Sequence, residues 1–382
     1  MIRRPPRSTL SPSSAASDVY KRQGIAYVRI KCVCKEFGVR DNPVNSVCID
    51  GNRFIPVELI DVAGLVPDAW KGRGLGNQFL DELRRADVLI HVIDASGSTD
   101  IEGRPVKMGE HDPLEDVKFL ERELNMWIMG ILKKDWQKIS KKATMLGEDV
   151  VEILANRLSG LGIETVSVKK AIESADLSGK RLDSWSEKDL YLFIDLLRHY
   201  SKPMLIAANK ADLPTAEDNI KRLKKELKDY IIIPTSAESE LALRKAASKG
   251  LIKYIPGDDN FEEIGPLTES QKKALKYIRE NVLEKWGSTG VQQVINEAFL
   301  KLLKLVAVFP VENENKLSDK QGRILPDVFL LPYGSTAKDL AYRIHTELGE
   351  KFMHAIDVRT RKKLSADYIL KHRDVLKIVT RR

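Results

Sequence analysis

Three short segments that are almost entirely apolar constrain the fold of this chain more than any other feature. They are residues 88–93, 204–208 and 231–233. Strands that are apolar on both faces are typical of a parallel sheet covered by helices on both sides. Parallel strands need long crossover connections, and the spacing of these segments leaves room for them. The sequence therefore predicts an α/β domain with a mostly parallel, doubly wound sheet.

Other periodic segments extend this pattern. Apolar residues alternate along residues 26–34, and residues 55–60 form a second strand-like run, followed by a predicted helix at 75–85. The strand signal then disappears. Asp112 and Pro113 mark a helix start, and Ser186 precedes an apolar stripe at helical spacing. We therefore predict a helical insertion at residues 113–200.

The end of the chain has a different pattern. Short strands are predicted at residues 306–311, 327–331, 355–358 and 375–379, around one helix at 337–348. Thr336 and Asp339 have the spacing of a helix cap, and Gly349 is predicted to end the helix in a left-handed conformation. This order within fewer than 80 residues predicts a β-grasp module.

The strongest local motif is the tetrapeptide Asn209-Lys210-Ala211-Asp212, directly after a buried strand. A carboxylate at Asp212 can accept hydrogen bonds from guanine N1–H and from its exocyclic amine, which adenine cannot offer. The stem of Lys210 would lie over the base, and Asn209 would connect neighbouring loops. A solvated loop is the alternative reading, but the position at the carboxyl end of a strand favours a guanine site.

Two further motifs stand where a nucleotide switch needs them. Asp61 and Gly64 frame a DxxG sequence after residues 55–60, so Asp61 would hold Mg²⁺ through water and the Gly64 amide would contact a γ-phosphate. Thr235-Ser236-Ala237 follows the next strand, and Ser236 and Ala237 would contact guanine O6. The three motifs occur in the order DxxG, NKxD and Thr-Ser-Ala along the chain, and their occurrence together strengthens the prediction of a guanine-nucleotide site.

Residues 61–96, DVAGLVPDAWKGRGLGNQFLDELRRADVLIHVIDAS, resemble the Obg family of GTP-binding proteins, and most closely its YchF-like, archaeal-type branch. The segment LPYGST, residues 331–336, resembles the signature of a TGS domain. The resemblance covers essentially all of residues 24–382. It implies GTP and Mg²⁺ as cofactors. Better-known YchF-like proteins have an altered NKxD motif and prefer ATP, but this chain keeps Lys210 and Asp212, which favours GTP.

Two departures from the family pattern affect the expected activity. The sequence contains no GxxxxGK[ST] motif; in the family, the phosphate loop lies upstream of the position that matches Gly24. In its place stand 23 residues, MIRRPPRSTLSPSSAASDVYKRQ, which resemble a translated sequencing adapter and have the composition of a transit peptide. We expect this leader to be disordered. Leu65 occupies the position where many GTPases have a water-orienting Gln, so hydrolysis would be slow.

Charge suggests a class of partner. Residues 305–382 contain 15 Lys or Arg and 10 Asp or Glu, a surplus of five positive charges. Such a surplus suits ribosomal RNA, and it is also common on ordinary solvated surfaces. The sequence has no apolar run long enough for a membrane span, and we expect no membrane or DNA partner.

The three cysteines fit a reducing cytosol rather than a disulfide framework. Cys32, Cys34 and Cys48 have the chemistry of three zinc ligands. Cys32 and Cys34 share the apolar face of one predicted strand, however, and no fourth ligand is near in sequence, so core packing is the favoured interpretation.

Together these features predict that the parent protein is a cytoplasmic GTP-binding protein that hydrolyses GTP slowly and acts on ribosomes or structured RNA, whereas this chain is expected to be inactive because the phosphate loop is missing. The alternative is a truncated or chimeric chain that cannot hold phosphates and retains only the TGS module and its RNA interaction. The predicted fold is a P-loop-type GTPase domain lacking its first strand and phosphate loop, with a helical insertion and a β-grasp TGS domain. Its predicted parts are a leader (1–23), the GTPase domain (24–112 and 201–304), the insertion (113–200) and the TGS domain (305–382).

Overall fold

The computed structural model describes residues 23–62 and 82–381. The leader before Gln23, the predicted helix up to residue 81, and the positions Gly64 and Leu65 lie outside the described residues. The chain divides into two compact units. The first contains residues up to Leu59 together with Ile295–Arg382, and the second contains Ile60–Val294.

The second unit is built on a parallel sheet whose strand order is β4-β5-β6. Each strand lies within a residue of its predicted position. All residues of β5 except the last are buried, as the apolar run predicts. The parallel sheet confirms the predicted α/β class. The strands are β4 (Leu89–Asp94), β5 (Met204–Asn209) and β6 (Ile231–Pro234).

Helix α8 (Ala216–Glu226) covers this sheet. Its buried residues Ile220 and Leu223 belong to a core that also contains Ile93 and Ile206 of the strands. Residues 82–85 are helical as well, and Leu83 packs in a small cluster with Leu124. Neighbouring elements bury the central strand β5, which is why a continuous apolar run suits it, whereas β4 is only partly buried and its Val92 is exposed.

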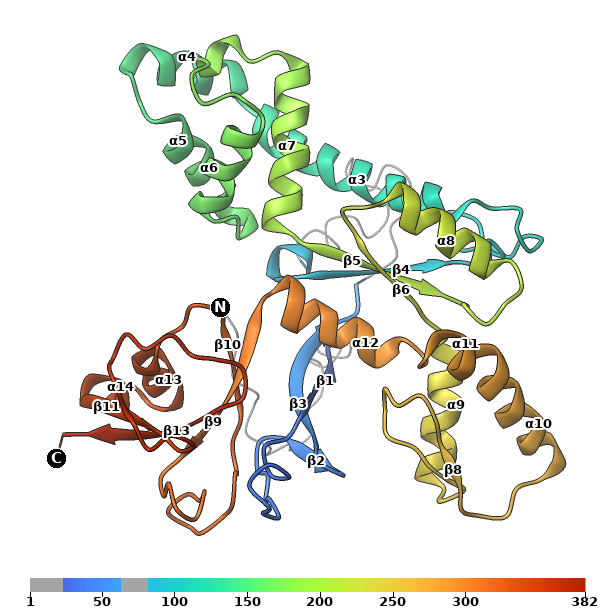
Figure 1. Cartoon of the computed structure of the whole chain (residues 1–382). Helices are drawn as coiled ribbons and strands as arrows, with labels where there is room; N and C mark the ends of the chain where they lie inside the picture. The colour runs from blue at the N-terminus through green and yellow to red at the C-terminus, as the bar shows by residue number, and fades with distance from the viewer. Residues whose placement is uncertain (1–22, 63–81, 382) are drawn as a thin grey trace, which may run out of the picture. The chain divides into compact units, whose positions relative to one another are not determined.

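Five helices between residues 113 and 201 form a separate bundle with its own core (Figure 1). Asp112 caps the first helix by accepting the amide hydrogen of Leu114, and Ser186 begins the last with a capping box completed by Asp189. Among the described helices of the protein, none is both long and apolar enough to cross a membrane. The bundle helices are α3 (Pro113–Lys133), α4 (Trp136–Leu146), α5 (Val150–Leu158), α6 (Thr165–Ser174) and α7 (Glu187–Ser201).

Residues after β6 form a small helical layer that the sequence reading did not resolve. Its core includes Leu243, Phe261, Leu275 and Val282. Thr268 caps one of its helices with Gln271. The elements are α9 (Ala237–Ser248), β7 (Ile252–Lys253), β8 (Glu262–Glu263), α10 (Glu269–Ile278), η4 (Arg279–Leu283), α11 (Glu284–Trp286) and α12 (Val291–Asn296).

The first unit contains a three-stranded sheet in the order β1-β3-β2. Its strands are β1 (Gln23–Lys31), β2 (Val47–Ile49) and β3 (Asn52–Ile60). The expectation that Cys32 and Cys34 share a face of the first strand is wrong, because the strand ends at Lys31 and a turn follows. The backbone reverses there through the hydrogen bond from Val39 N–H to the Cys34 carbonyl, 2.9 Å long.

The C-terminal sheet has the order β10-β9-β13-β11-β12, with β9 and β13 parallel at its centre. The predicted helix is interrupted at His345, whose extended backbone separates α13 from α14. Gly349 lies inside α14 without a left-handed φ, so its predicted role was wrong; a Cβ there would lie 2.2 Å from the Tyr342 ring. The elements are β9 (Leu305–Val311), β10 (Phe329–Pro332), α13 (Ala337–Ile344), α14 (Thr346–Glu350), β11 (Phe352–Asp357), β12 (Lys363–Leu364) and β13 (Asp374–Thr380).

The two sheets of the first unit share a hydrophobic core. Val28 and Ile30 of β1 belong to the same buried cluster as Phe309 of β9 and Val375 of β13. Glu36 accepts hydrogen bonds from Arg359 and Arg373 and adds polar contacts between the same regions. The sequence reading did not anticipate this shared core, and its domain boundaries remain predictions.

Candidate functional site

The carboxyl ends of β4, β5 and β6 carry the residues singled out from the sequence. Asp94 pairs in register with Asn209, and Ala208 pairs with Pro234. Because the strands are parallel and in register, the loops that follow them emerge at one edge of the sheet. The edge therefore brings together residues more than a hundred positions apart in sequence.

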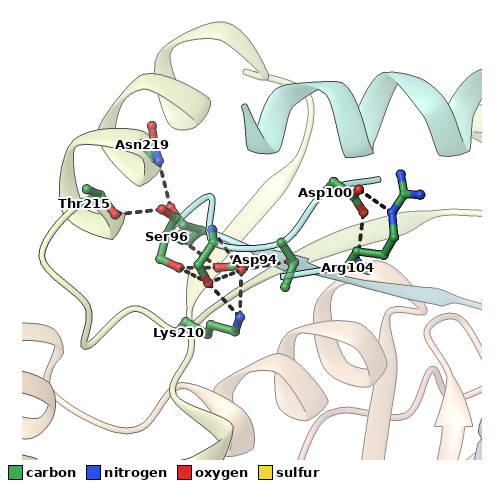
Figure 2. A network of polar contacts seen from close by, with 10 residues as sticks. Asp94, Ser96, Asp100, Arg104, Lys210, Thr215 and Asn219 are labelled. Carbon is green, nitrogen blue, oxygen red and sulfur yellow. Dashed lines mark hydrogen bonds and ion pairs between the residues drawn. The ribbon is translucent and has the colours of Figure 1, made fainter. Parts of the chain in front are cut away.

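Asp94 is the centre of a polar network that the sequence reading missed (Figure 2). Its Oδ1 accepts hydrogen bonds from the amide and hydroxyl of Ser96, while its Oδ2 accepts from the hydroxyls of Ser98 and Thr99. Burial raises the pKa of Asp94, but the hydrogen bonds from Lys210 and the hydroxyl groups outweigh it, so the pKa lies below its usual range. Asp94 is consequently an anion at neutral pH.

Lys210 contacts this network directly. Its backbone is left-handed, with φ of 59°, and its Nζ lies 2.8 Å from Asp94 Oδ2 and 2.9 Å from Ser98 Oγ. Two contacts from α8 hold the same loop: Thr215 donates to the Ser96 carbonyl, and Asn219 donates to the Ala95 carbonyl (Figure 2). The ammonium group is therefore fixed at the edge of the sheet.

Asn209 connects the loops after β5 and β6, as predicted for this position. Its Oδ1 accepts the amide hydrogen of Ala237 at 3.1 Å. The backbone adds two further contacts, from the Thr235 amide to the Ala208 carbonyl and from the Ala211 amide to the Thr235 carbonyl. The two motifs separated by 22 intervening residues in sequence are thus one hydrogen-bonded structure.

Asp212 faces a set of hydroxyl groups. Ser236 Oγ donates to Asp212 Oδ1 at 2.8 Å, and the Tyr277 hydroxyl lies 3.4 Å from Asp212 Oδ2. Burial raises the pKa of Tyr277, and the negative charge of Asp212 raises it further. The Asp212 carboxylate therefore acts as a hydrogen-bond acceptor at this edge of the sheet. Guanine offers two donors, N1–H and the exocyclic amine, that a carboxylate can accept.

A third segment, residues 286–290 at the end of α11, contacts the loops after β5 and β6. The Ser236 amide donates to the Thr289 carbonyl, and Trp286 Nε1 donates to the Ala211 carbonyl at 3.1 Å. Gly290 has φ of 78°, and a Cβ there would lie 1.9 Å from the Pro234 carbonyl oxygen. Sequence reading missed this segment because a Ser-Thr-Gly loop carries no nucleotide signature.

The switch residues are described only in part. Asp61 follows β3 with an exposed side chain, so its carboxylate is accessible to a hydrated cation. Gly64 lies outside the described residues. The roles of both residues remain predictions.

Three family models match the chain. Residues 35–129 match a 50S ribosome-binding GTPase, residues 207–313 match the Obg-like GTPase YGR210-like, G4 motif-containing domain, and residues 320–380 match the TGS domain. The second match contains the Asn209–Asp212 tetrapeptide and its Ser236 partner. Along the chain, the three matched segments come in the same order as the DxxG, NKxD and LPYGST motifs.

Individual relatives extend these matches to nearly the whole chain. An uncharacterised GTP-binding protein of Methanocaldococcus jannaschii is 53% identical over 362 residues, which are 95% of this chain and 90% of that protein. The ribosome-binding ATPase YchF of Bacillus subtilis is 30% identical over 65% of this chain and 64% of its own length.

A solved structure is similar over almost the same extent. The crystal structure of a GTP-binding protein from Pyrococcus horikoshii has a TM-score of 0.75 and 42% sequence identity, covering 94% of this chain and 93% of that chain. None of the comparisons supports the alternative of a truncated chain with only a TGS function. With the motifs, their geometry and these relatives in agreement, the chain belongs to the YchF-like branch of the Obg family of GTP-binding proteins.

Proposed function

We propose that this protein binds guanine nucleotides at the carboxyl ends of β4, β5 and β6, and that Asp212 selects the base. The observation that carries the proposal is the carboxylate of Asp212, held by Ser236 and joined to Asn209 through the β6 loop. Guanine N1–H and its amino group would donate to this carboxylate. Adenine has an acceptor at N1 and no amino group at C2, so it would leave the carboxylate unpaired.

The same proposal assigns supporting roles to the neighbours of Asp212. The methylene stem of Lys210 would lie along the base while its ammonium group remains near Asp94. Ser236 would orient the carboxylate, and the Ala237 amide would exchange its present hydrogen bond to Asn209 for one to guanine O6. These contacts fix the orientation of the base.

Mg²⁺ is the metal that the family implies. The exposed carboxylate of Asp61 is a hard oxygen ligand of the kind that this cation takes, directly or through water. The bound cation would neutralise phosphate charge. Asp61 would hold its hydration shell, and Gly64 would present a backbone amide to the γ-phosphate. Because Leu65 cannot orient a water molecule, slow GTP hydrolysis is expected.

A ribosomal partner is proposed on two grounds. One family model that matches the chain describes a 50S ribosome-binding GTPase, and the C-terminal region carries the positive surplus that suits RNA. We propose a cytoplasmic location with this role. Co-sedimentation with purified ribosomal subunits, with and without a GTP analogue, tests this; failure to co-sediment under any nucleotide and at low salt would contradict it.

Replacing Asp212 tests base selection. In Asp212→Asn, the amide nitrogen would face the amino group of guanine, donor against donor, but could donate to the C2 carbonyl of xanthine. We expect GTP affinity to fall by roughly 5–150-fold, equivalent to ~1–3 kcal/mol, and the xanthine nucleotide to become the preferred ligand. Titrations that follow intrinsic tryptophan fluorescence or heat measure both affinities.

Asp218→Asn is the matched control, because Asp218 is an exposed carboxylate in the first turn of α8. It should leave the affinities for GTP, ATP and the xanthine nucleotide unchanged. Equal affinity of the unmodified protein for GTP and ATP would overturn the assignment of Asp212.

A further inference from the structure

A second polar cluster lies in the first unit, in the turn after β1 and in the hairpin of β2 and β3. The sequence offered three cysteines and no nearby fourth ligand, but the fold supplies one. The ligand atoms of the four residues all lie within 4.8 Å of one another. This cysteine cluster consists of Cys32, Cys34, Asp41 and Cys48.

The distances inside the cysteine cluster match a tetrahedral metal site. The Sγ atoms of Cys34 and Cys48 are 3.9 Å apart, and Cys32 Sγ is 3.3 Å from Asp41 Oδ2. With Zn–S bonds of about 2.3 Å, the edge of a tetrahedron of sulfurs is roughly 3.8 Å. A disulfide would need the two sulfurs about 2.05 Å apart. The sulfurs are therefore placed for a shared ion rather than for a bond to each other.

Backbone contacts hold the ligands in place independently of any ion. The Cys32 amide donates to the Gly51 carbonyl at 2.8 Å, which ties the end of β1 to the hairpin turn. Cys48 pairs with Arg53 in the ladder of β2 and β3. Cys32 and Cys34 are buried, and Cys48 is partly buried. Such preorganisation reduces the ordering that metal binding would otherwise require.

A buried cation offsets part of the negative charge of the cysteine cluster. The Arg53 side chain has an exposed fraction of 0%, and its Nη2 lies 3.1 Å from Asp41 Oδ2. It also donates to the Leu325 carbonyl and to Ser46. Three thiolates and a carboxylate around Zn²⁺ would carry two net negative charges, and Arg53 offsets one of them. A buried charge is stable when it has such a partner.

We propose that Cys32, Cys34, Asp41 and Cys48 bind one Zn²⁺ ion, which staples the turn after β1 to the hairpin of β2 and β3. Zinc is the metal of choice because thiolate sulfur is a soft ligand and the four groups form a closed tetrahedral set with no position left for substrate. The site would therefore be structural. It lies outside the guanine site and does not depend on nucleotide binding.

The test uses the full-length chain purified without chelator, with metal content measured by mass spectrometry and Co²⁺ substitution followed by optical absorption. We expect about one Zn²⁺ per chain, and thiolate-to-cobalt charge-transfer bands with tetrahedral visible absorption after exchange. Because the chain has only three cysteines, thiol counting is unambiguous. The three thiols should resist alkylation with Zn²⁺ present and react after chelation.

Substitutions test whether the proposed ligands, rather than neighbouring residues, hold the metal. Cys48→Ser should reduce the bound zinc to about none, and Asp41→Asn should weaken Zn²⁺ affinity by roughly 10–100-fold. Asp50→Asn, in the hairpin turn but outside the cluster, is the matched control and should keep its zinc. Circular dichroism checks that each variant is folded, and tryptophan fluorescence checks that the second unit is unchanged.

Two results would overturn the proposal. One is an unmodified protein that takes up neither Zn²⁺ nor Co²⁺ and whose three thiols react freely. The other is a Cys34–Cys48 disulfide as the stable form under the mildly reducing conditions of purification. Both measurements are made on the unmodified chain, so they decide the question even where a variant fails to fold.

Discussion

The guanine loops (residues 209–212, 235–237 and 289–290) and the cysteine cluster are assembled in opposite ways. The guanine loops join distant parts of the chain through backbone and side-chain hydrogen bonds, such as those from Ala237 to Asn209 and from Ser236 to Thr289. The cysteine cluster comes from a single stretch of 17 residues folded back on itself. The first depends on the register of a parallel sheet, and the second on one turn and one buried arginine.

This difference can be measured because each unit carries its own probe. All five tryptophans lie between Ile60 and Val294, and all three cysteines lie before Leu59. Tryptophan fluorescence therefore reports the unit with the guanine loops, and thiol reactivity reports the unit with the cysteine cluster. A perturbation of one cluster can be followed separately from the other.

The largest effect is expected from Arg53→Leu. The substitution leaves Asp41 without its cation and the Leu325 carbonyl without its donor, inside a buried environment. Breaking one side of a buried ion pair costs ~3–5 kcal/mol. Thiol reactivity in increasing urea should show that much destabilisation of the first unit.

Arg40→Leu is the control for Arg53, because Arg40 is exposed in the same connection between β1 and β2. It should change thiol reactivity little, and the tryptophan transition should stay where it is in both variants. An Arg53 variant that unfolds like the unmodified chain would mean that the cysteine cluster does not depend on a buried cation.

Sequence patterns singled out the guanine loops but indicated only part of the cysteine cluster, for a physical reason. The guanine motif is contiguous and directly follows an apolar strand. The apolar pattern of that strand and the position of the motif at its carboxyl end therefore both indicate it. Asp41 is separated from the nearest cysteine by six residues, and only the turn closed by Val39 and Cys34 brings it near them. That closure depends on Arg53, whose burial no local pattern reveals.

The difference between local and distant contacts also explains which of the other sequence predictions were confirmed and which were wrong. The helix caps at Asp112, Ser186 and Thr336 were predicted because capping is a local interaction. The break at His345 was missed, since Gly349 looked like the natural stop but is required by the Tyr342 ring beside it. Asp94 was not singled out from the sequence, although the hydroxyl residues that follow it are a usable signal for a capped turn.

Gly290→Ala tests whether close backbone approach locks the guanine loops. Gly287 is its matched control: both residues have φ near 80°, but a Cβ at Gly287 would meet nothing within 4 Å, while one at Gly290 would meet the Pro234 carbonyl. The strain of the left-handed backbone is common to both variants. We expect Gly290→Ala to be ~1–3 kcal/mol more destabilising in urea unfolding followed by tryptophan fluorescence.

The added cost should be accompanied by weaker guanine nucleotide binding, since Thr289 holds the Ser236 amide next to Gly290. Equal destabilisation by the two alanine substitutions would show that the loop can move away from Pro234. In that case close backbone packing would not hold the guanine loops together, and the contrast between these loops and the cysteine cluster would not stand.

The smallest effect is a pH dependence carried by Asp94. Its folded-state pKa lies below the unfolded value of about 3.9, so its contribution to stability is complete above that value and is lost as the pH falls through the folded-state pKa. Asp94→Asn should cost ~1–2 kcal/mol at neutral pH, a reduced figure because the Lys210 side chain is 38% exposed and partly screened. The difference in stability between this variant and the unmodified chain should shrink below about pH 4, as Asp94 itself becomes protonated. Thr215→Val removes a neutral contact to the same loop, the hydrogen bond to the Ser96 carbonyl, so its cost should stay constant over that range. A stability difference for Asp94→Asn that is as flat as the one for Thr215→Val would show that the charge of Asp94 does not hold the loop after β4.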